Sequence, residues 1–138
     1  MTPERDSNDE AGGPLVTGQI LFTAQTPSFR QATVHLYLED VSYADAEAEV
    51  IAEAVIPAVH HDPTRGESRQ RRATTVPFVI DAPAGMQALD ERNLYAVRVW
   101  VDRDGDGLEG PGDLFSDQSY RVLTRGFGRR VSIRLGPR

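Results

Sequence analysis

The sequence predicts an all-β protein, a small antiparallel β-sandwich of about seven strands. Apolar residues recur at every second position in several short segments, which is typical of half-buried strands. Proline- and glycine-containing turn signals separate these segments. A chain of 138 residues is also long enough to form one stable hydrophobic core without the support of disulfide bonds.

In chain order, the expected strands are Leu15–Thr23, Thr33–Glu39, Val50–Ile56, Val76–Ile80, Leu94–Val101, Leu114–Val122 and Arg130–Leu135. The alternation of apolar and polar residues is clearest in the second, fifth and seventh of these segments. Tyr43–Ala54 is rich in alanine and glutamate, so propensity alone would allow a helix there. We expect a loop or turn over Tyr43–Ala48, followed by the third strand.

Two segments lack any apolar pattern. Residues 1–13 are predicted to be a disordered acidic tail, which leaves residues 14–138 as a single sandwich domain. His60–Thr74 contains proline, glycine and four arginines, and we expect a long exposed loop. No apolar run approaches the roughly 20 residues of a membrane span, so direct membrane insertion is not expected.

The composition excludes several classes of chemistry. The chain has no cysteine, and all 15 of its basic residues are arginine, so thiolate, disulfide and lysine chemistry are absent. A net charge of −6 disfavours binding to nucleic acid. We find no catalytic motif, and the sequence predicts a protein that is not an enzyme.

The sharpest chemical motif is the acidic loop, residues 102–113, which contains aspartates at its first, third, fifth and twelfth positions. Calcium needs six to eight oxygen ligands around a tight turn, and a glycine at the sixth position permits that turn. Here that glycine is Gly107. The predicted calcium ligands are the side chains of Asp102, Asp104, Asp106 and Asp113 and the main-chain carbonyl of Leu108. We expect a structural Ca²⁺ site carried between two strands.

Other interpretations of this loop stay open. Acidic, glycine-rich turns also occur without a metal. A calcium-responsive sensor would use the same ligands, and an enzyme using metal-bound water would need an open coordination position and a general base beside it. A transition-metal site at His60, His61 and Asp62 is disfavoured, because adjacent residues of an extended chain point apart. We expect these three residues in a solvated loop.

A second candidate site lies on a sheet surface. By alternation, Arg98 and Trp100 face away from the valines of their strand, and His35 and Tyr37 face away from the leucines of theirs. Exposed tryptophan, tyrosine and arginine are typical anchors of protein interfaces. If these two faces coincide, we predict that Tyr37, Arg98 and Trp100 bind a protein or peptide partner. The alternative is that both faces of the strand are buried, or that the N-terminal tail covers it. The sequence leaves the oligomeric state open.

Several segments together resemble the YbaY/YscW family, small bacterial envelope lipoproteins that include the type III secretion pilotins. The matching segments are the 34–46 stretch with its Asp40-Val-Ser42-Tyr-Ala-Asp-Ala motif, Val50–Glu53, Gly18 with Ile20, Pro77-Phe78, Tyr95–Arg98, Phe115–Asp117 and Tyr120–Thr124. Together they span about residues 15–135.

This resemblance implies a non-enzymatic β-sandwich in the cell envelope, and in the pilotin branch a domain that binds a secretin segment and helps it to reach the outer membrane. A small domain of this family without a pilotin role is the alternative. Neither a secretory signal nor a lipid-accepting cysteine is found, so a cytoplasmic location is expected if Met1 is the true start. The acidic loop indicates a calcium-stabilised branch of the family.

Overall fold

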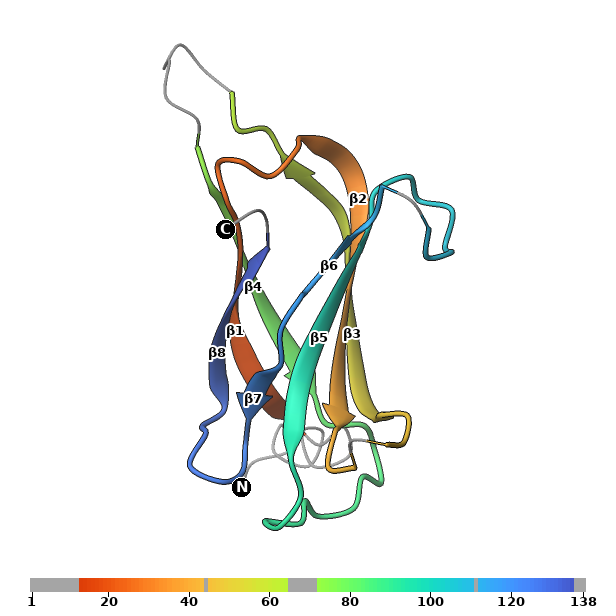
Figure 1. Cartoon of the computed structure of the whole chain (residues 1–138), viewed down its shortest axis with the longest axis vertical. Coiled ribbons are helices and arrows are strands. Elements are labelled where there is room, and N and C mark those ends of the chain that lie inside the picture. Colours follow the sequence, from red (N-terminus) through yellow and green to blue (C-terminus); the bar gives the residue numbers. More distant parts are fainter. Residues whose placement is uncertain (1–12, 44, 65–71, 111, 136–138) are drawn as a thin grey trace, which may run out of the picture.

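The computed structural model describes residues 13–43, 45–64, 72–110 and 112–135, and these form eight strands in two sheets (Figure 1). The strands are β1 (Pro14–Phe22), β2 (Phe29–Asp40), β3 (Glu49–His61), β4 (Thr74–Asp81), β5 (Tyr95–Asp102), β6 (Leu114–Phe115), β7 (Tyr120–Val122) and β8 (Arg130–Leu135). The all-β prediction is confirmed. Among the described residues, no helix is long and apolar enough to cross a bilayer.

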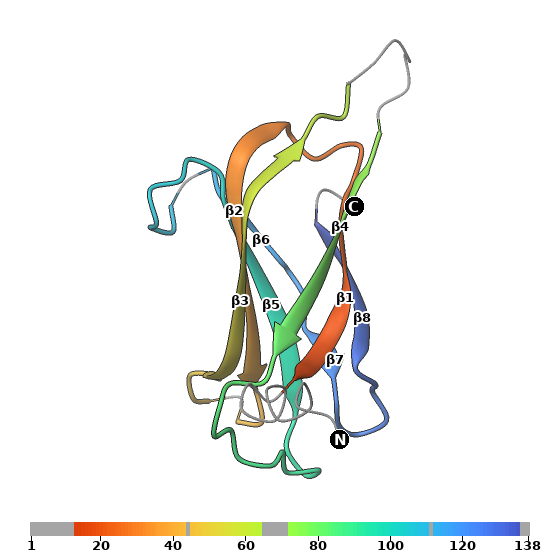
Figure 2. The ribbon, with the colours of Figure 1, turned by 180° about the vertical axis from the view of Figure 1, so that it is seen from behind.

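The two sheets face each other across the core, as the opposite views in Figures 1 and 2 show. One sheet has the strand order β4-β1-β8, and the other has the order β3-β2-β5-β6, with β7 also pairing with β5. Strand pairing is antiparallel except between β1 and β8, which run parallel. The sandwich is therefore not purely antiparallel as predicted, because the last strand lies beside the first in the same direction.

One expected strand, Leu114–Val122, is divided into β6 and β7. Ser116 is the reason, because its hydroxyl accepts the N–H of Val99 at 3.0 Å while its own N–H donates to the Val99 carbonyl. A side chain thus takes the place of a main-chain acceptor, and the regular ladder with β5 stops. The count is eight strands rather than about seven.

The loops agree in part with expectation. The described residues between Val41 and Ala48 form a turn and no helix, as predicted. The predicted loop His60–Thr74 is shorter than expected, because β3 continues through His61. Residues 65–71 of that loop, and residues 1–12 of the predicted tail, lie outside the described residues.

The core consists of the inward-facing residues of both sheets. In the five-stranded sheet, Val34, Leu36 and Leu38 of β2 are fully buried beside the valines of β5. In the other sheet, Gly18 lies so close to β8 that an added Cβ would stand 1.9 Å from the Val131 carbonyl oxygen. The contact between β1 and β8 therefore requires glycine at this position.

The Asp40-Val-Ser42 part of the family-like motif has a structural role. One carboxylate oxygen of Asp40 accepts hydrogen bonds from the N–H and hydroxyl of Ser42, and the other accepts the Asn93 side-chain amide at 3.0 Å. The Ser42 hydroxyl in turn accepts the N–H of Leu94 at 2.9 Å. These bonds tie the end of β2 to the turn that leads into β5.

Candidate partner-binding face and cation loop

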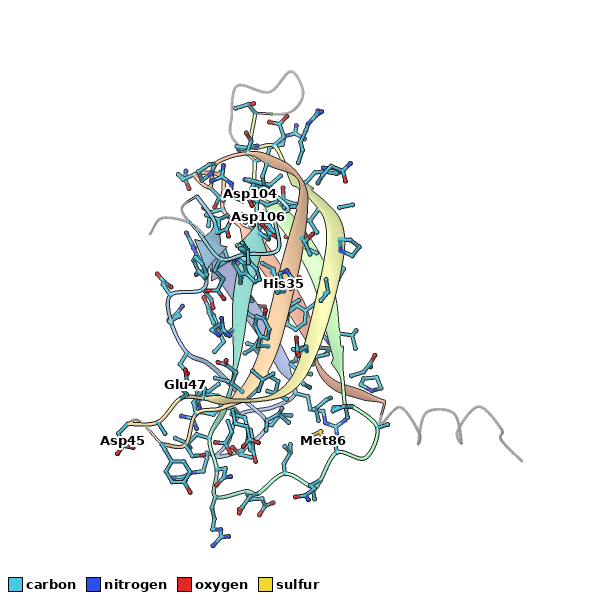
Figure 3. All side chains as sticks on the ribbon, turned by 90° about the vertical axis from the view of Figure 1, so that its right-hand side faces the viewer. His35, Asp45, Glu47, Met86, Asp104 and Asp106 are labelled. Carbon is cyan, nitrogen blue, oxygen red and sulfur yellow. The ribbon has the colours of Figure 1, made fainter. Side chains whose placement is uncertain are left out.

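The acidic loop (residues 102–113) begins at the last residue of β5 and ends just before β6. In Figure 1 it projects from the outer side of the five-stranded sheet. Asp102, Asp104 and Asp106 bring one carboxylate oxygen each to within 4.8 Å of one another. Figure 3 shows Asp104 and Asp106 beyond His35, toward the end of the sheet from which the loop departs. The predicted clustering of these three aspartates is confirmed.

The loop is closed by its own hydrogen bonds. Asp102 is buried, and its two carboxylate oxygens accept the N–H groups of Gly105 at 3.0 Å and Gly107 at 2.8 Å. Both glycines have positive φ angles, 72° and 76°, a backbone conformation that residues with a Cβ atom rarely adopt. The alternating Asp-Gly spacing therefore folds the carboxylates toward one point.

The first two aspartates of the cluster differ in their affinity for a proton. Burial acts to raise the pKa of Asp102, but hydrogen bonds from the Gly107 N–H and the Asp104 side chain, with others in the loop, lower it below its ordinary value. The pKa of Asp104 is raised, mainly because of that same hydrogen bond to Asp102. As the pH falls, Asp104 therefore takes up a proton before Asp102 does.

The two remaining predicted ligands lie differently. Leu108 is exposed. Asp113 is not one of the three clustered aspartates; its carboxylate accepts Trp100 Nε1 at 2.9 Å, the Arg103 N–H at 3.1 Å and the Gly110 N–H at 3.2 Å. Asp113 thus fastens the loop to β5. Calcium binding by Asp113 and by the Leu108 carbonyl stays a prediction.

The second candidate site lies on the outer face of the five-stranded sheet, the side that faces the viewer in Figure 3. His35 is paired with Trp100 across β2 and β5, and Tyr37 is paired with Arg98. The His35 ring stacks on Trp100 with 4.3 Å between centroids, and the Arg98 guanidinium lies 4.4 Å from the centre of the Tyr37 ring. The two faces therefore coincide, and these four residues share one surface.

The expected exposure of Trp100 is wrong. Its side chain is only 5% exposed, because His35 covers one side of the indole and the acidic loop reaches its N–H through Asp113. Tyr37 and Arg98 are half-buried. Arg98 is held by Glu39, with Nε–Oε2 at 3.1 Å, and more loosely by Glu109, with Nη1–Oε2 at 4.0 Å.

Two residues of this face escaped the sequence analysis. Val55 of β3 pairs with His35, and Phe115 of β6 pairs with Trp100. Their side chains are 55% and 42% exposed. The alternation within each strand indicates which residues point outward. It does not indicate that Val55 and Phe115 lie beside the stacked His35 and Trp100 rings, because this depends on the order of the strands in the sheet.

The histidine pair after Val59 is also placed differently from expectation. His60 lies on the surface and accepts the Gln31 N–H, but His61 is buried rather than solvated. Its ring nitrogens hydrogen-bond to the Thr74 hydroxyl and the Thr26 carbonyl oxygen, at 2.7 and 3.1 Å. The described residues contain a possible metal cluster at the acidic loop, and His60, His61 and Asp62 do not contribute to it.

The fold and these sites together define a two-sheet β-domain with an aromatic outer face and an acidic loop fastened to it. The family of type III secretion system lipoprotein chaperones (YscW) matches residues 12–135 of the sequence. The chain belongs to this family, as the sequence resemblance predicted.

One solved structure, described as an alternative pilotin from the type II secretion system of Vibrio cholerae, is similar to this one. The two chains are 24% identical, the match covers 87% of this chain and 92% of the other, and the TM-score is 0.59. At that identity the similarity concerns the fold. No curated protein matches the sequence at a significant level.

Proposed function

We propose that the chain is a non-catalytic binding module of the pilotin type, which holds a segment of a secretin in the bacterial cell envelope. The observation that carries this proposal is the family match over residues 12–135, which spans both sheets of the sandwich. Members of the family are described as chaperones, and a chaperone acts by binding its partner rather than by chemical conversion.

We assign the binding surface to the outer face around Tyr37 and Arg98. Tyr37 offers a half-buried ring, and burial, more than any neighbouring charge, raises the pKa of its hydroxyl. Arg98 is already oriented by Glu39 and by the Tyr37 ring. A side chain held in place before binding loses less conformational entropy when the partner arrives. Trp100 serves as the packed base of the stack rather than as an exposed anchor.

The acidic loop is proposed to bind one structural Ca²⁺ through Asp102, Asp104 and Asp106, with Leu108 and Asp113 completing the set. Support comes from the convergence of three carboxylate oxygens and from the conformation of the loop glycines. Calcium would reduce the electrostatic repulsion among these carboxylates. Because only the native state forms the site, calcium binding would also stabilise the fold.

A calcium-responsive module is the second candidate, and one contact favours it. Asp113 belongs to the acidic loop and at the same time accepts the N–H of Trp100 on the binding face. If the ion recruits Asp113, the contact with Trp100 changes. A structural site raises the melting temperature and leaves partner affinity unchanged, whereas a sensor changes that affinity.

The proposal is tested with overlapping segments of the secretin that the same cell produces. We expect one of them to bind the purified chain in a calorimetric titration and to be retained by the chain in a pull-down. The same titration in EDTA and in excess calcium separates the structural site from the sensor. If no part of the secretin binds in either condition, the pilotin role is refuted and the chain is a family member with another function.

A further inference from the structure

The outer face of the five-stranded sheet carries a continuous row of apolar and aromatic side chains that crosses four strands. The register pairs Val55 of β3 with His35 of β2, His35 with Trp100 of β5, and Trp100 with Phe115 of β6. We call these four residues the outer row. Three strand spacings of about 4.8 Å make it about 14 Å long.

The two ends of the outer row are exposed and its centre is packed. Val55 is 55% and Phe115 is 42% exposed, while His35 and Trp100 stack on each other between them. The outward side of a sheet at the surface of a sandwich is usually polar, so an apolar and aromatic row with exposed ends on it indicates an interaction site. The stacked rings of His35 and Trp100 form a flat, packed surface, and the exposed side chains at the two ends provide the apolar area that a partner would bury.

Carboxylates border this row. The next row of the same face contains Glu53, Tyr37 and Arg98, which are paired across β3, β2 and β5. The negative charges of Glu53, Glu109 and Glu39 each raise the pKa of the Tyr37 hydroxyl, whereas the positive charge of Arg98 lowers it. The Arg98 guanidinium is already paired with two of the three carboxylates, so the border has an excess of negative charge.

We infer that the outer row binds an amphipathic segment that is apolar along one side and carries arginine or lysine beside it. The inference rests on the proposed binding function and names the chemistry of the partner. Apolar side chains of the segment cover Val55 and Phe115, and its basic groups pair with Glu53 and Glu109. A row about 14 Å long matches about nine residues of helix, so a short segment suffices.

Two matched sets of variants test the site. Val55→Ser and Phe115→Ser remove the exposed apolar ends, and Val79→Ser is the control, because Val79 is similarly exposed on the other sheet. Glu53→Gln and Glu109→Gln remove border charges, and the exposed Glu91 provides the control Glu91→Gln. All of these side chains are at least partly exposed, so the variants should fold, which is checked by melting temperature and near-ultraviolet circular dichroism.

Two kinds of probe are titrated against each variant. The first is a set of overlapping peptides that cover the secretin. The second is a designed helical peptide of about 18 residues with a leucine stripe flanked by arginines, together with a counterpart that has glutamate in place of arginine.

We expect each apolar variant to weaken binding of the secretin peptide and of the leucine-arginine peptide by about tenfold, which is typical of a truncated anchor. The charge variants should weaken binding less and should reduce its dependence on salt concentration. Both controls should bind as the wild type does, and the leucine-glutamate peptide should bind more weakly than its arginine counterpart.

The outcomes separate this inference from the proposed function. If a secretin peptide binds wild type and all outer-row variants equally, the pilotin role stands and the outer row is refuted as its site. If only the leucine-arginine peptide binds, and the outer-row variants lose it, the site stands and the secretin assignment falls. Equal binding of the arginine and glutamate peptides refutes the charge preference, and no binding of any probe refutes both.

Discussion

Replacing Asp113 by alanine should loosen the acidic loop from the sheet and destabilise the domain. The Asp113 carboxylate accepts three N–H groups, from Trp100, Arg103 and Gly110, at 2.9, 3.1 and 3.2 Å. The donor on Trp100 belongs to a side chain that is only 5% exposed. Without its acceptor, this indole N–H is left unpaired in a packed environment or must be hydrated by an opening of the loop.

The cost follows from these three donors. A buried donor left without a partner costs about 1–3 kcal/mol, and each of the two partly buried main-chain donors contributes about 0.5–1 kcal/mol, since water can replace the carboxylate there. The sum for Asp113→Ala is about 2–5 kcal/mol. For a domain of this size, that corresponds to a fall in melting temperature of roughly 10 °C.

The assay combines thermal unfolding in EDTA with intrinsic fluorescence. Trp100 is the only tryptophan of the chain, so its emission reports directly on this contact. We expect the emission of Asp113→Ala to shift to longer wavelength as the indole becomes hydrated. Asp106→Ala is the matched control within the loop, because this exposed carboxylate accepts the Leu108 N–H, a donor of the loop itself, and its removal should leave both readouts close to wild type.

Two results would refute the reasoning. If Asp113→Ala melts at the wild-type temperature with unchanged emission, the bond to Trp100 does not fasten the loop. If Asp106→Ala in EDTA is destabilised as strongly as Asp113→Ala, the loss reflects general disruption of the loop rather than the unpaired indole donor.

Three further predictions concern the loop and the fold. Calcium at a hundredfold excess over its dissociation constant should stabilise the wild type by about 2.7 kcal/mol, and Asp104→Asn should remove most of this gain. If the wild type has the same melting temperature in calcium and in EDTA, the loop binds no calcium. Gly18→Ala should lower the free energy of unfolding by about 3 kcal/mol or prevent folding, because its Cβ would meet the Val131 carbonyl oxygen at 1.9 Å, while Gly128→Ala, with open space around it, should change a denaturant midpoint little. Asp40→Ala should lower the free energy of unfolding, measured by chemical denaturation, by about 2–3 kcal/mol, because three donors lose their acceptor. If this loss is smaller than the loss on replacing an exposed aspartate, the motif does not have this structural role.

Local patterns in the sequence were sufficient for the features that depend on neighbouring residues. Alternation along Thr33–Glu39 and Leu94–Val101 correctly separated core from outer face, since successive side chains of a strand point to opposite sides. The Asp102–Asp106 spacing predicted the carboxylate cluster because its members lie within five residues of one another. The same reasoning failed at Leu114–Val122, where a serine side chain interrupts the ladder.

What the sequence by itself determined is the fold class, the family, the inward face of the three clearly alternating strands and the convergence of the loop aspartates. The tertiary structure decided the rest. It buried Trp100 beneath His35 and Asp113, turned His61 into the core, and aligned Val55 with Phe115 across four strands. The physical reason is that strand order and register depend on contacts between residues far apart in the chain, and local side-chain periodicity carries no information about which strands become neighbours.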